Sequence, residues 1–503
     1  METGREGLKG TGILIKKAAI RLSLGLPRGV GASEDLSFCV AGRAPTDKMS
    51  VSKFDLILEG VHKFMRRGAI GHLTNMINKL HPVDVGKVIE HLSTTHEKKE
   101  VFDLIRNVQV KARVIKELDS LCRTEILTYM PSQEIVSILY ELASDDVAAI
   151  MGELPPEKYQ DVLKLMHHED SQEVQDLLEH PKETAGRLMN TDFFSLPQET
   201  TVEQAIKEVR VASEREMVFY LYVTDKEERL VGVVSLRQLL VVPPDTPLQR
   251  IMNPEVISVT MDTDQEEMAR QVTRYNLLAI PVVDKDNKLA GIITFDDVID
   301  VVREEATEDI LKMAGAGAPE EEFMLHTSSL NAARYRLPWL LTTLFGTMIT
   351  ASIVWFFRFT LHEVIALVTF MPVIAAMGGN VGVQSSTIVV RGLATGRIDL
   401  ANLWKVVLRE MKVGILMALA CGLTLTLVAY VWHAHVMLGM VLGAAMFSAI
   451  TVAAITGALV PVVLKKMNID PAISSGPFVT TANDITGLVI YLGLATYLLQ
   501  YLR

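Results

Sequence analysis

The chain has 503 residues, which is too long for one ordinary domain, and it carries a net charge of −11 at neutral pH. This acidic balance argues against nucleic acid as a partner. The three cysteines, Cys39, Cys122 and Cys421, are scattered without a CxxC pair, so the sequence predicts neither disulfides nor a zinc site and fits a reduced cytoplasmic setting. Residues up to about 330 are rich in charge and the remainder is strongly apolar, which indicates a soluble part followed by a membrane part.

Residues 1–48 are predicted to be an N-terminal extension that is disordered or weakly amphipathic. Its apolar stretch, residues 13–26, is interrupted by Lys16, Lys17 and Arg21, so it is neither a membrane span nor a clean signal peptide. Met49 is an alternative translation start.

Residues 49–184 are predicted to be a helical domain, because apolar residues recur three and four positions apart. Helix starts are expected near residues 82, 132, 144 and 156, where Pro or Ser precedes an acidic residue. Pro loses no hydrogen bond in a first helical turn, and carboxylates there interact well with the helix dipole. Repeated short amphipathic helices favour a superhelix, with an ordinary helical bundle as the alternative.

Residues 185–302 contain one mixed α/β pattern twice. The first copy begins RLMNTDFFSLP and the second begins RIMNPEVISVT. Each continues with a helix, a strand, a charged turn and a final strand that leads into a helix. A duplication of this size implies two modules packed face to face.

These copies resemble a tandem pair of CBS domains, with boundaries at 185–245 and 246–302. The resemblance implies a site for an adenine nucleotide such as ATP between the copies, with a ribose-binding Asp in a Ser/Thr-x-x-Asp pattern after the last strand. Thr294 and Asp297 match this pattern in the second copy, whereas Ser235 is followed by Gln238 in the first. A purely structural pair is the alternative.

Residues 303–330 are predicted to form an acidic connecting helix. Carboxylates run into it and through it, at Asp296, Asp297, Asp300, Glu304, Glu305, Glu308, Asp309 and Glu320 to Glu322. On a helix, four of them would share one face and repel one another: Asp297, Asp300, Glu304 and Glu308. A solvated acidic face is one interpretation. The other is a face neutralised by divalent cations, since hard cations prefer several oxygen ligands.

Residues 331–503 are predicted to cross a membrane five times, at about 336–357, 364–390, 412–432, 437–464 and 474–502. Each stretch supplies the roughly 20 apolar residues that a bilayer core requires. The loops after the second and fourth spans are basic, and the loop after the third has no Lys or Arg. The positive-inside rule therefore places the amino-terminal half in the cytoplasm and the carboxyl terminus outside.

Small and polar residues cluster in the second predicted span, where lipid would favour Leu: Gly378, Gly379, Asn380, Gly382, Gln384, Ser385, Ser386 and Thr387. Glycines permit either close helix packing or local unwinding that frees carbonyls to line a cavity. Asn380 and Gln384 are four residues apart and share a helix face. Packing alone is one interpretation, and a path for hard cations is the other.

Asp484 is the one carboxylate expected well inside a predicted span. A carboxylate there is costly unless it faces the interior of the bundle or a wet cavity. A lone acid facing a pore suits a cation pathway, whereas hydrogen bonds from Thr480, Thr481 or Thr486 would make it structural. Together with Asn380 and Gln384 it favours a path for hard cations.

The membrane motifs, with Asp470-Pro471-Ala472 and Thr480-Thr481-x-x-Asp484-x-x-Gly487, resemble the MgtE family of magnesium channels over about residues 50–503. The resemblance implies a helical N domain, a CBS pair, a connecting plug helix and five spans, assembled as a homodimer around one pore. Asp484 matches the key pore carboxylate of the family. The pore positions that we predict are Asp484, Asn380, Gly378, Gly379, Gln384 and Thr481, and the acidic residues of the plug junction match regulatory Mg²⁺ sites.

The predicted function is Mg²⁺ entry into the cytoplasm through a multi-pass protein of the cell membrane, shut by Mg²⁺ bound at the acidic junction. Other divalent cations are open as partners. An enzyme is not expected, because no catalytic constellation and no GxxxxGK[ST] loop occurs in the sequence. Two alternatives are a coupled carrier of divalent cations, including one for Co²⁺, and a non-conducting nucleotide sensor.

Overall fold

The computed structural model describes residues 46–211, 220–316, 329–398, 403–474 and 476–502. The predicted extension, residues 1–48, lies almost wholly outside the described residues. The chain divides into two compact units at Lys79, so the predicted helical domain from residue 49 includes parts of both units. The first unit contains α2 (Thr46–Arg66) and α3 (Ile70–Ile77), which pack on each other where Gly60 meets the Met76 side chain.

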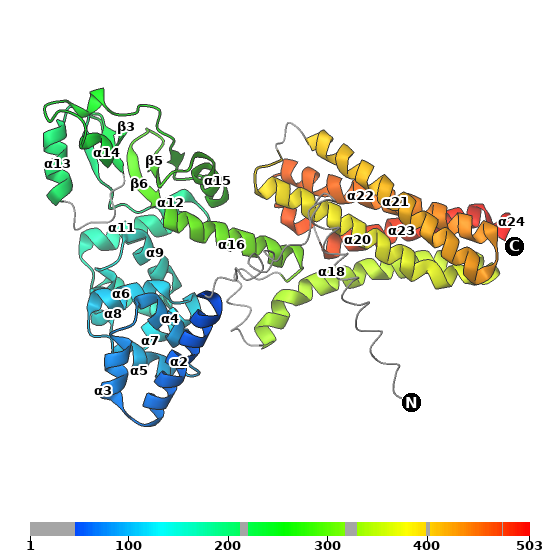
Figure 1. Cartoon of the computed structure of the whole chain (residues 1–503), viewed down its shortest axis with the longest axis horizontal. Helices are drawn as coiled ribbons and strands as arrows, with labels where there is room; N and C mark the ends of the chain where they lie inside the picture. Colours follow the sequence, from blue (N-terminus) through cyan, green and yellow to red (C-terminus); the bar gives the residue numbers. More distant parts are fainter. Residues whose placement is uncertain (1–45, 212–219, 317–328, 399–402, 475, 503) are drawn as a thin grey trace, which may run out of the picture. The chain divides into compact units, whose positions relative to one another are not determined.

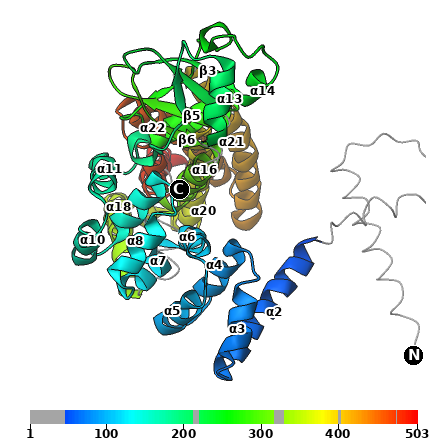
Figure 2. The same ribbon diagram turned by 90° about the vertical axis from the view of Figure 1, so that its left-hand side faces the viewer.

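The helices that follow Lys79 form the predicted superhelix rather than a simple bundle. Their bounds are α4 (Pro82–Glu90), α5 (Thr95–Asp103), α6 (Val108–Glu117), α7 (Ser120–Thr128), α8 (Ser132–Leu139), α9 (Ser144–Glu153), α10 (Pro156–Leu163) and α11 (His168–Glu179). Each helix packs on the next but one, so that α4, α6, α8 and α10 form one row and α5, α7, α9 and α11 form another (Figure 2). The helix starts expected near residues 82, 132, 144 and 156 are confirmed.

The duplicated segment forms two sheets with the same topology. The first contains β1 (Ser195–Pro197), β2 (Tyr220–Thr224) and β3 (Leu230–Ser235), and the second contains β4 (Val259–Thr260), β5 (Ala279–Val283) and β6 (Leu289–Thr294). In each sheet the first pair of strands is parallel and the second is antiparallel. The helices of this pair are α12 (Ala185–Leu188), α13 (Val202–Val211), α14 (Leu236–Leu239), η3 (Leu248–Arg250) and α15 (Gln265–Tyr275).

The charged turns of the two copies have the same design. Asp225 and Asp284 each accept hydrogen bonds from the backbone N–H groups two and four residues later. Glu228 and Asn287 occupy equivalent left-handed positions, with φ of 65° and 62°. The backbone N–H of Leu230 donates to Asn287 O, and that of Leu289 donates to Glu228 O, so the two turns join the copies.

The leading segment of each copy pairs with the other copy. Asn190 forms an antiparallel bridge with Ile292 of β6, and Asn253 forms one with Val233 of β3. Gly291 and Gly232 sit at equivalent points, where a Cβ atom would meet Met189 and Met252. The RLMN and RIMN segments therefore each pair with a strand of the other copy. Short-range sequence patterns do not specify this exchange.

A single helix, α16 (Phe295–Met313), follows directly after β6 (Figure 1). The predicted connecting segment, 303–330, therefore begins inside this helix, and Glu320 to Glu322 lie outside the described residues. Asp297 and Glu308 are half-buried on α16, whereas Asp300 and Glu304 are exposed.

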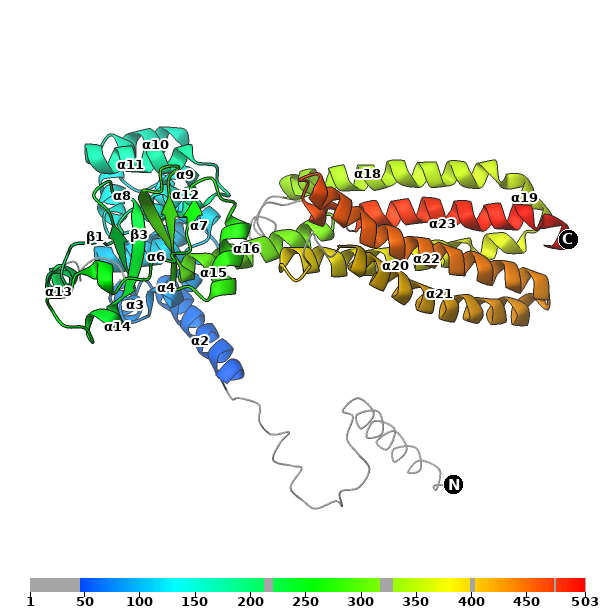
Figure 3. The ribbon, with the colours of Figure 1, turned by 90° about the horizontal axis from the view of Figure 1, so that it is seen from above.

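Five described helices are long and apolar enough to cross a membrane: α18 (Ser329–Phe356), α20 (Ala366–Ala394), α21 (Leu403–His433), α22 (Val436–Lys466) and α23 (Pro477–Tyr497). Short elements join or follow them, namely α19 (Arg358–Glu363), η5 (Pro471–Ser474) and α24 (Leu499–Leu502). The long helices lie side by side, with α22 packed against α20, α21 and α23, and with α18 against α23 (Figure 3). The largest difference from the predicted bounds is at α21, which begins at Leu403 rather than near residue 412. The helix also includes the basic residues that precede its apolar stretch.

Small residues let these helices approach closely. A Cβ atom on Gly457 would overlap the backbone of Gly382, and one on Gly414 would overlap Ala454. Within a membrane, helix association relies on such close packing. The helix α20 is continuous through its glycines, so close packing prevails there over the local unwinding considered above.

Candidate functional site: Asp484 and the two ends of α16

Asp484 lies half-buried on α23, facing α20. Its Oδ1 is 3.7 Å from the position that a Cβ atom on Gly379 would occupy. Gly378 and Gly379 are buried beneath α23, so in the protomer they provide room for its side chains and backbone. Thr481, one turn earlier on α23, packs into the space left by Gly346 of α18.

The neighbouring hydroxyl groups do not hold Asp484. Thr480 Oγ1 donates to Gly476 O at 2.9 Å, and Thr481 Oγ1 donates to Pro477 O at 2.7 Å. Thr486 Oγ1 lies 3.0 Å from its acceptor, Ala482 O. Each hydroxyl has one hydrogen and gives it to the backbone, so the interpretation of Asp484 as a carboxylate fixed by these threonines is not supported.

Asn380 and Gln384 lie together on the exposed face of α20. Ala376, Asn380, Gln384, Thr387 and Arg391 are all exposed, at spacings of three and four residues, which places them on one side of the helix. We call Asn380, Gln384, Thr387 and Arg391 the α20 polar stripe. Amide groups facing lipid would lack hydrogen-bond partners, so this stripe requires a polar environment.

Asn483 is a buried polar residue that sequence reasoning missed. It is 2% exposed, and its Oδ1 accepts a hydrogen bond of 2.8 Å from Thr456 Oγ1 of α22. Its Nδ2 fills the space above Gly382 and has no hydrogen-bond partner among the described residues. The adjacent Asp484 drew attention because it is charged, whereas an amide next to it gives a weaker signal.

Glu410 is a second carboxylate within a long apolar helix. It belongs to α21 and is only 5% exposed. The predicted third span began at residue 412, so Glu410 lay outside the stretches in which Asp484 was expected to be the one carboxylate, and the helix as it forms includes Glu410. Val407, Glu410 and Gly414 are three and four residues apart, so they lie on one face of α21. Val407 and Gly414 face α22.

The predicted regulatory carboxylates separate into two groups at opposite ends of α16. At the first end, Thr294 Oγ1 lies 2.5 Å from both Asp296 Oδ1 and Asp297 Oδ2, and its single hydrogen can satisfy only one of them. Burial raises the pKa of Asp297, and the hydrogen bond from Thr294 and the charge of Lys116 oppose this shift. Lys116 of α6 also forms an ion pair of 2.7 Å with Asp146 of α9.

At the other end of α16, carboxylates meet the loop that precedes α23. Lys312 Nζ is 2.6 Å from Glu308 Oε1 and 2.8 Å from Asp470 Oδ2. Burial raises the pKa of Asp309 to about 6, and the nearby charges of Asp470 and Glu266 add to this. Glu305 accepts a hydrogen bond of 2.7 Å from Gln265 of α15. Asp470 and Glu266 were not among the predicted site residues.

The last turn of α16 is in direct contact with the start of α23. A Cβ atom on Gly476 would overlap Met313 O, and one on Gly315 would lie 2.7 Å from Pro477 Cγ. Gly476 and Gly315 have φ of 61° and 69°, which favours glycine at both positions. Asp484 is seven residues beyond Pro477, about 10 Å along the helix.

The chemistry of these oxygen donors suits a hard cation such as Mg²⁺. In the described residues, however, no group of three or more His, Cys, Asp or Glu side chains is arranged to hold a metal ion. An ammonium group, Lys312, occupies the space between Glu308 and Asp470 instead. A divalent ion at this end would therefore have to displace Lys312 or bind beside it.

The predicted nucleotide residues are already engaged in local contacts. Asp297 Oδ2 lies against Thr294 Oγ1, as described above. At the equivalent place in the first copy, Ser235 and Gln238 form a reciprocal cap on α14. The position of the ribose-binding Asp is thus occupied by a capping amide in one copy and by a carboxylate near Lys116 in the other.

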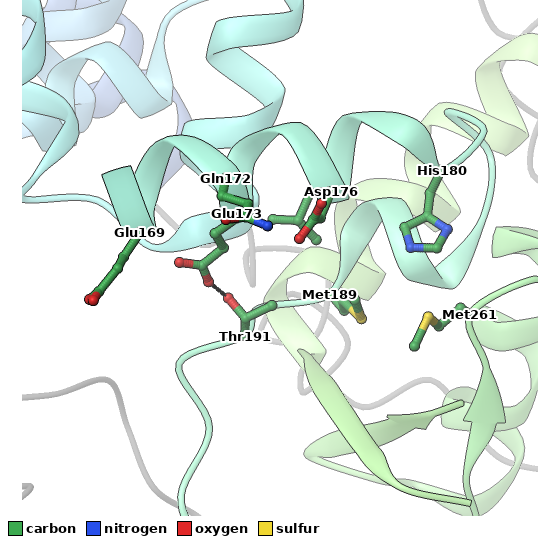
Figure 4. Close-up of a pocket in the computed structure, with 9 residues that line it drawn as sticks. Glu169, Gln172, Glu173, Asp176, His180, Met189, Thr191 and Met261 are labelled. Carbon is green, nitrogen blue, oxygen red and sulfur yellow. Dashed lines mark hydrogen bonds between the residues drawn. The ribbon is translucent and has the colours of Figure 1, made fainter. Parts of the chain in front are cut away.

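A cavity of about 480 Å³ lies beside α11, between the helical domain and residues of both CBS copies. Glu173, Asp176 and His180 line it from the helical side, and Met189 and Met261 form its other wall (Figure 4). Glu173 is hydrogen-bonded to Thr191. Burial raises the pKa of Glu173, with a further contribution from Asp192. None of the predicted site residues lines this cavity.

Known protein families match successive parts of this chain. Residues 371–494 match the divalent cation transporter model MgtE, residues 80–183 match the MgtE intracellular N domain, and residues 185–245 and 248–304 match the CBS domain. One similar crystal structure is that of the cytosolic domain of the Mg²⁺ channel MgtE in complex with ATP, which is 32% identical at a TM-score of 0.46. The match covers 48% of this chain and 99% of that chain.

Curated relatives match nearly two thirds of this chain. The magnesium transporter MgtE of Bacillus subtilis is 39% identical over 318 residues, which are 63% of this chain and 70% of that protein. The transporter of the same name from Enterococcus faecalis is 40% identical over 63% of this chain and 70% of its own length, and that from Thermus thermophilus is 39% identical over 64% and 71%. These relatives are named as transporters and not as enzymes. With this identity over more than two thirds of each relative, the chain belongs to the MgtE family of magnesium transporters.

Proposed function

We propose that this protein is a Mg²⁺ channel that admits the ion into the cytoplasm down its electrochemical gradient. The observation that carries the proposal is Asp484, a half-buried carboxylate on a membrane helix whose neighbouring hydroxyl groups all donate to the backbone. An acid in this position needs a cation or water. A family of magnesium transporters supplies the identity of the cation.

The pore forms between two copies of the chain. In one copy the α20 polar stripe is exposed, and its amides would be unsatisfied against lipid. A second copy related by a twofold axis would cover the stripe and bring a second Asp484 towards the first. Asn380 and Gln384 would then supply amide oxygens along the path, while Gly378, Gly379 and Thr481 set the spacing of the helices around it.

A pair of carboxylates suits Mg²⁺ because this ion keeps several waters and is commonly held through one or two carboxylates. Binding of the hydrated ion is weak enough for release, as conduction requires. An inside-negative potential contributes about 2.3 kcal/mol per charge per 100 mV, and about twice that for a divalent ion. This drives Mg²⁺ inward when the soluble half faces the cytoplasm and the carboxyl terminus lies outside.

The two ends of α16 provide the gate. Cytosolic Mg²⁺ would neutralise Asp296, Asp297 and Asp300 against the helical domain, and Glu304, Glu305, Glu308 and Asp309 near the membrane loops. Because the last turn of α16 contacts Gly476 and Pro477, a fixed α16 would hold α23 in a closed position. At low Mg²⁺ the carboxylates repel, and the populations shift towards an open form.

An adenine nucleotide such as ATP is proposed only at the second CBS copy, through Thr294 and Asp297. Two facts restrict this site: Asp297 is close to Lys116, and the first copy has Gln238 in place of the carboxylate. Nucleotide and Mg²⁺ would therefore compete for Asp297, and ATP should raise the Mg²⁺ concentration that closes the channel if it binds there.

The direct test is Mg²⁺ flux into proteoliposomes, for the wild type and Asp484→Ala, with inner Mg²⁺ first low and then millimolar. The expected result is flux that needs Asp484 and stops at high inner Mg²⁺. Flux that is unchanged in Asp484→Ala would remove Asp484 from the pathway. It would then favour a coupled divalent-cation carrier, for Mg²⁺ or Co²⁺, or a membrane-anchored sensor if no flux is seen in either protein.

A further inference from the structure

A second polar site lies at the far end of α18 from the soluble domains. A groove of about 830 Å³ is lined by Ser352, Trp355, Phe356, Arg358, Phe359 and His362, which belong to the end of α18 and to α19. None of these residues takes part in the proposed pore or gate. The groove combines a basic group with an apolar wall, and that combination restricts what can fill it.

Arg358 provides the basic group. Its guanidinium carbon lies 4.5 Å from the centre of the Trp355 ring. Arg358 takes part in none of the ion pairs found among the described residues. A guanidinium held over an indole ring keeps its N–H groups free at the edge, where they can bind an anion in a bidentate manner.

The length of α18 indicates that the groove lies at the level of the lipid headgroups. The 28 residues of α18 span about 42 Å, which exceeds the roughly 30 Å of hydrocarbon in a bilayer. The end of α18 therefore emerges on the side opposite to its start. Trp355 is 68% exposed, and Trp is enriched at the membrane interface; Phe356 and Phe359 are 78% and 63% exposed beside it.

We propose that this groove binds an anionic phospholipid. The phosphate would accept hydrogen bonds from the Arg358 guanidinium, with His362 and Ser352 as further donors, and the acyl chains would cover Phe356 and Phe359. A free phosphate would leave these aromatic side chains uncovered. A choline headgroup carries its own cation, which would compete with Arg358 for the face of Trp355. A headgroup with net negative charge, such as phosphatidylglycerol, avoids this competition.

The test uses the fluorescence of Trp355 in the full-length protein. Trp339, Trp404 and Trp432 are replaced by Phe, and the protein is placed in phosphatidylcholine vesicles. A small fraction of the lipid is then replaced by a lipid whose acyl chains are brominated near the headgroup. In one sample this lipid is phosphatidylglycerol, and in the other it is phosphatidylcholine. We expect brominated phosphatidylglycerol to quench Trp355 about fivefold more effectively than brominated phosphatidylcholine. One arginine near the membrane surface strengthens the binding of anionic lipid by about this factor.

The variant Arg358→Gln should remove this preference, and Arg358→Lys should retain part of it, because Lys keeps the charge but loses the planar fork. Glu363→Gln is the matched control on the same helix and should retain the preference. Native mass spectrometry of the protein with all its tryptophans, with and without Arg358→Gln, gives an independent count of bound phosphatidylglycerol.

Three results would overturn the proposal. Equal quenching by both lipids with Arg358 present would show no headgroup selection. Loss of the preference on addition of inorganic phosphate would show that a free anion is the ligand. Quenching by neither lipid would show that a second copy of the chain covers this face.

Discussion

The two ends of α16 contain similar residues but differ in what they contact. At the first end, Asp296 and Asp297 compete for the single hydroxyl hydrogen of Thr294, and Asp297 lies near Lys116 of the helical domain. At the other end, Glu308 and Asp470 are bridged by Lys312, next to the start of α23. One end reports on the helical domain and the other touches the helix that carries Asp484. Under the proposed function, α16 would transmit a change in ion occupancy from the soluble part to the pore.

Removing the charge of both ends should produce the largest effect. In the variant Asp297→Asn, Asp300→Asn, Glu304→Gln and Glu308→Gln, the ligands for closing ions are lost, so flux at millimolar inner Mg²⁺ should rise to the level seen at low inner Mg²⁺. We expect a rise of about tenfold or more, because ions that close most channels must favour the closed form by at least ~1.4 kcal/mol. Vesicle flux measures this.

The matched control neutralises four exposed acids of the first CBS copy that lie away from α16, namely Glu199, Glu203, Glu208 and Glu227. Closing by Mg²⁺ should remain normal in that protein. If the α16 variant still closes normally, the role of α16 as a gate is wrong.

The close contact between α20 and α22 should be the next most sensitive feature. Gly457→Val forces a side chain into the backbone of Gly382, and overpacking of this kind costs about 1–3 kcal/mol. The expected result is a lower unfolding temperature in detergent. Gly493→Val is the control, because a Cβ atom there meets nothing within 4 Å. Equal stability of the two variants would contradict the packing that positions Asp484.

Lys312→Met changes only the membrane end of α16, so it should separate the contribution of that end from the contribution of the other. Without the ammonium group, Glu308 and Asp470 repel each other until a divalent ion binds. The channel should be more open at low Mg²⁺, and the closing concentration should change about fivefold, the equivalent of a partly buried ion pair of ~1 kcal/mol. Lys207→Met removes an exposed ion pair with Glu203 and serves as the control. An identical Mg²⁺ response in both variants would show that Lys312 has no part in closing.

The smallest effect should come from pH at the membrane end of α16. The pKa of Asp309 is raised to about 6 from an ordinary 3.8, so the folded state binds this proton more tightly than the unfolded state. Stability from this group is present below pH about 4 and is lost as pH rises through about 6. Thermal unfolding should therefore be less dependent on pH between 4 and 6 in Asp309→Asn than in the wild type. An unchanged dependence would remove Asp309 as its source.

Much of the architecture could be predicted because short-range sequence patterns determine it. Apolar spacing located the short helices and the long apolar ones, and the repeat of RLMN and RIMN exposed the duplicated module. The residues that were missed depend on contacts between distant segments. Asp470 meets Lys312 across 158 positions, and Thr456 meets Asn483 only after α22 and α23 pack. Glu410 becomes buried because α21 extends beyond its apolar stretch and its small neighbours bring α22 close.

The interpretation of Asp484 also shows what sequence can supply. Its charge within an apolar segment identified it without a structure. The structure adds that the hydroxyl groups of Thr480, Thr481 and Thr486 bond to the backbone of their own helix, so these three groups do not hold Asp484.

The measurement that tests the central claim most directly is the electrical current through single protein assemblies in a planar bilayer, while Mg²⁺ on the side of the soluble domains is raised from micromolar to millimolar. A self-gated channel predicts discrete Mg²⁺ currents at low Mg²⁺ that disappear as the ion rises, and that are absent in Asp484→Asn. Tracer flux without such currents, or currents indifferent to Mg²⁺ on that side, would contradict the account.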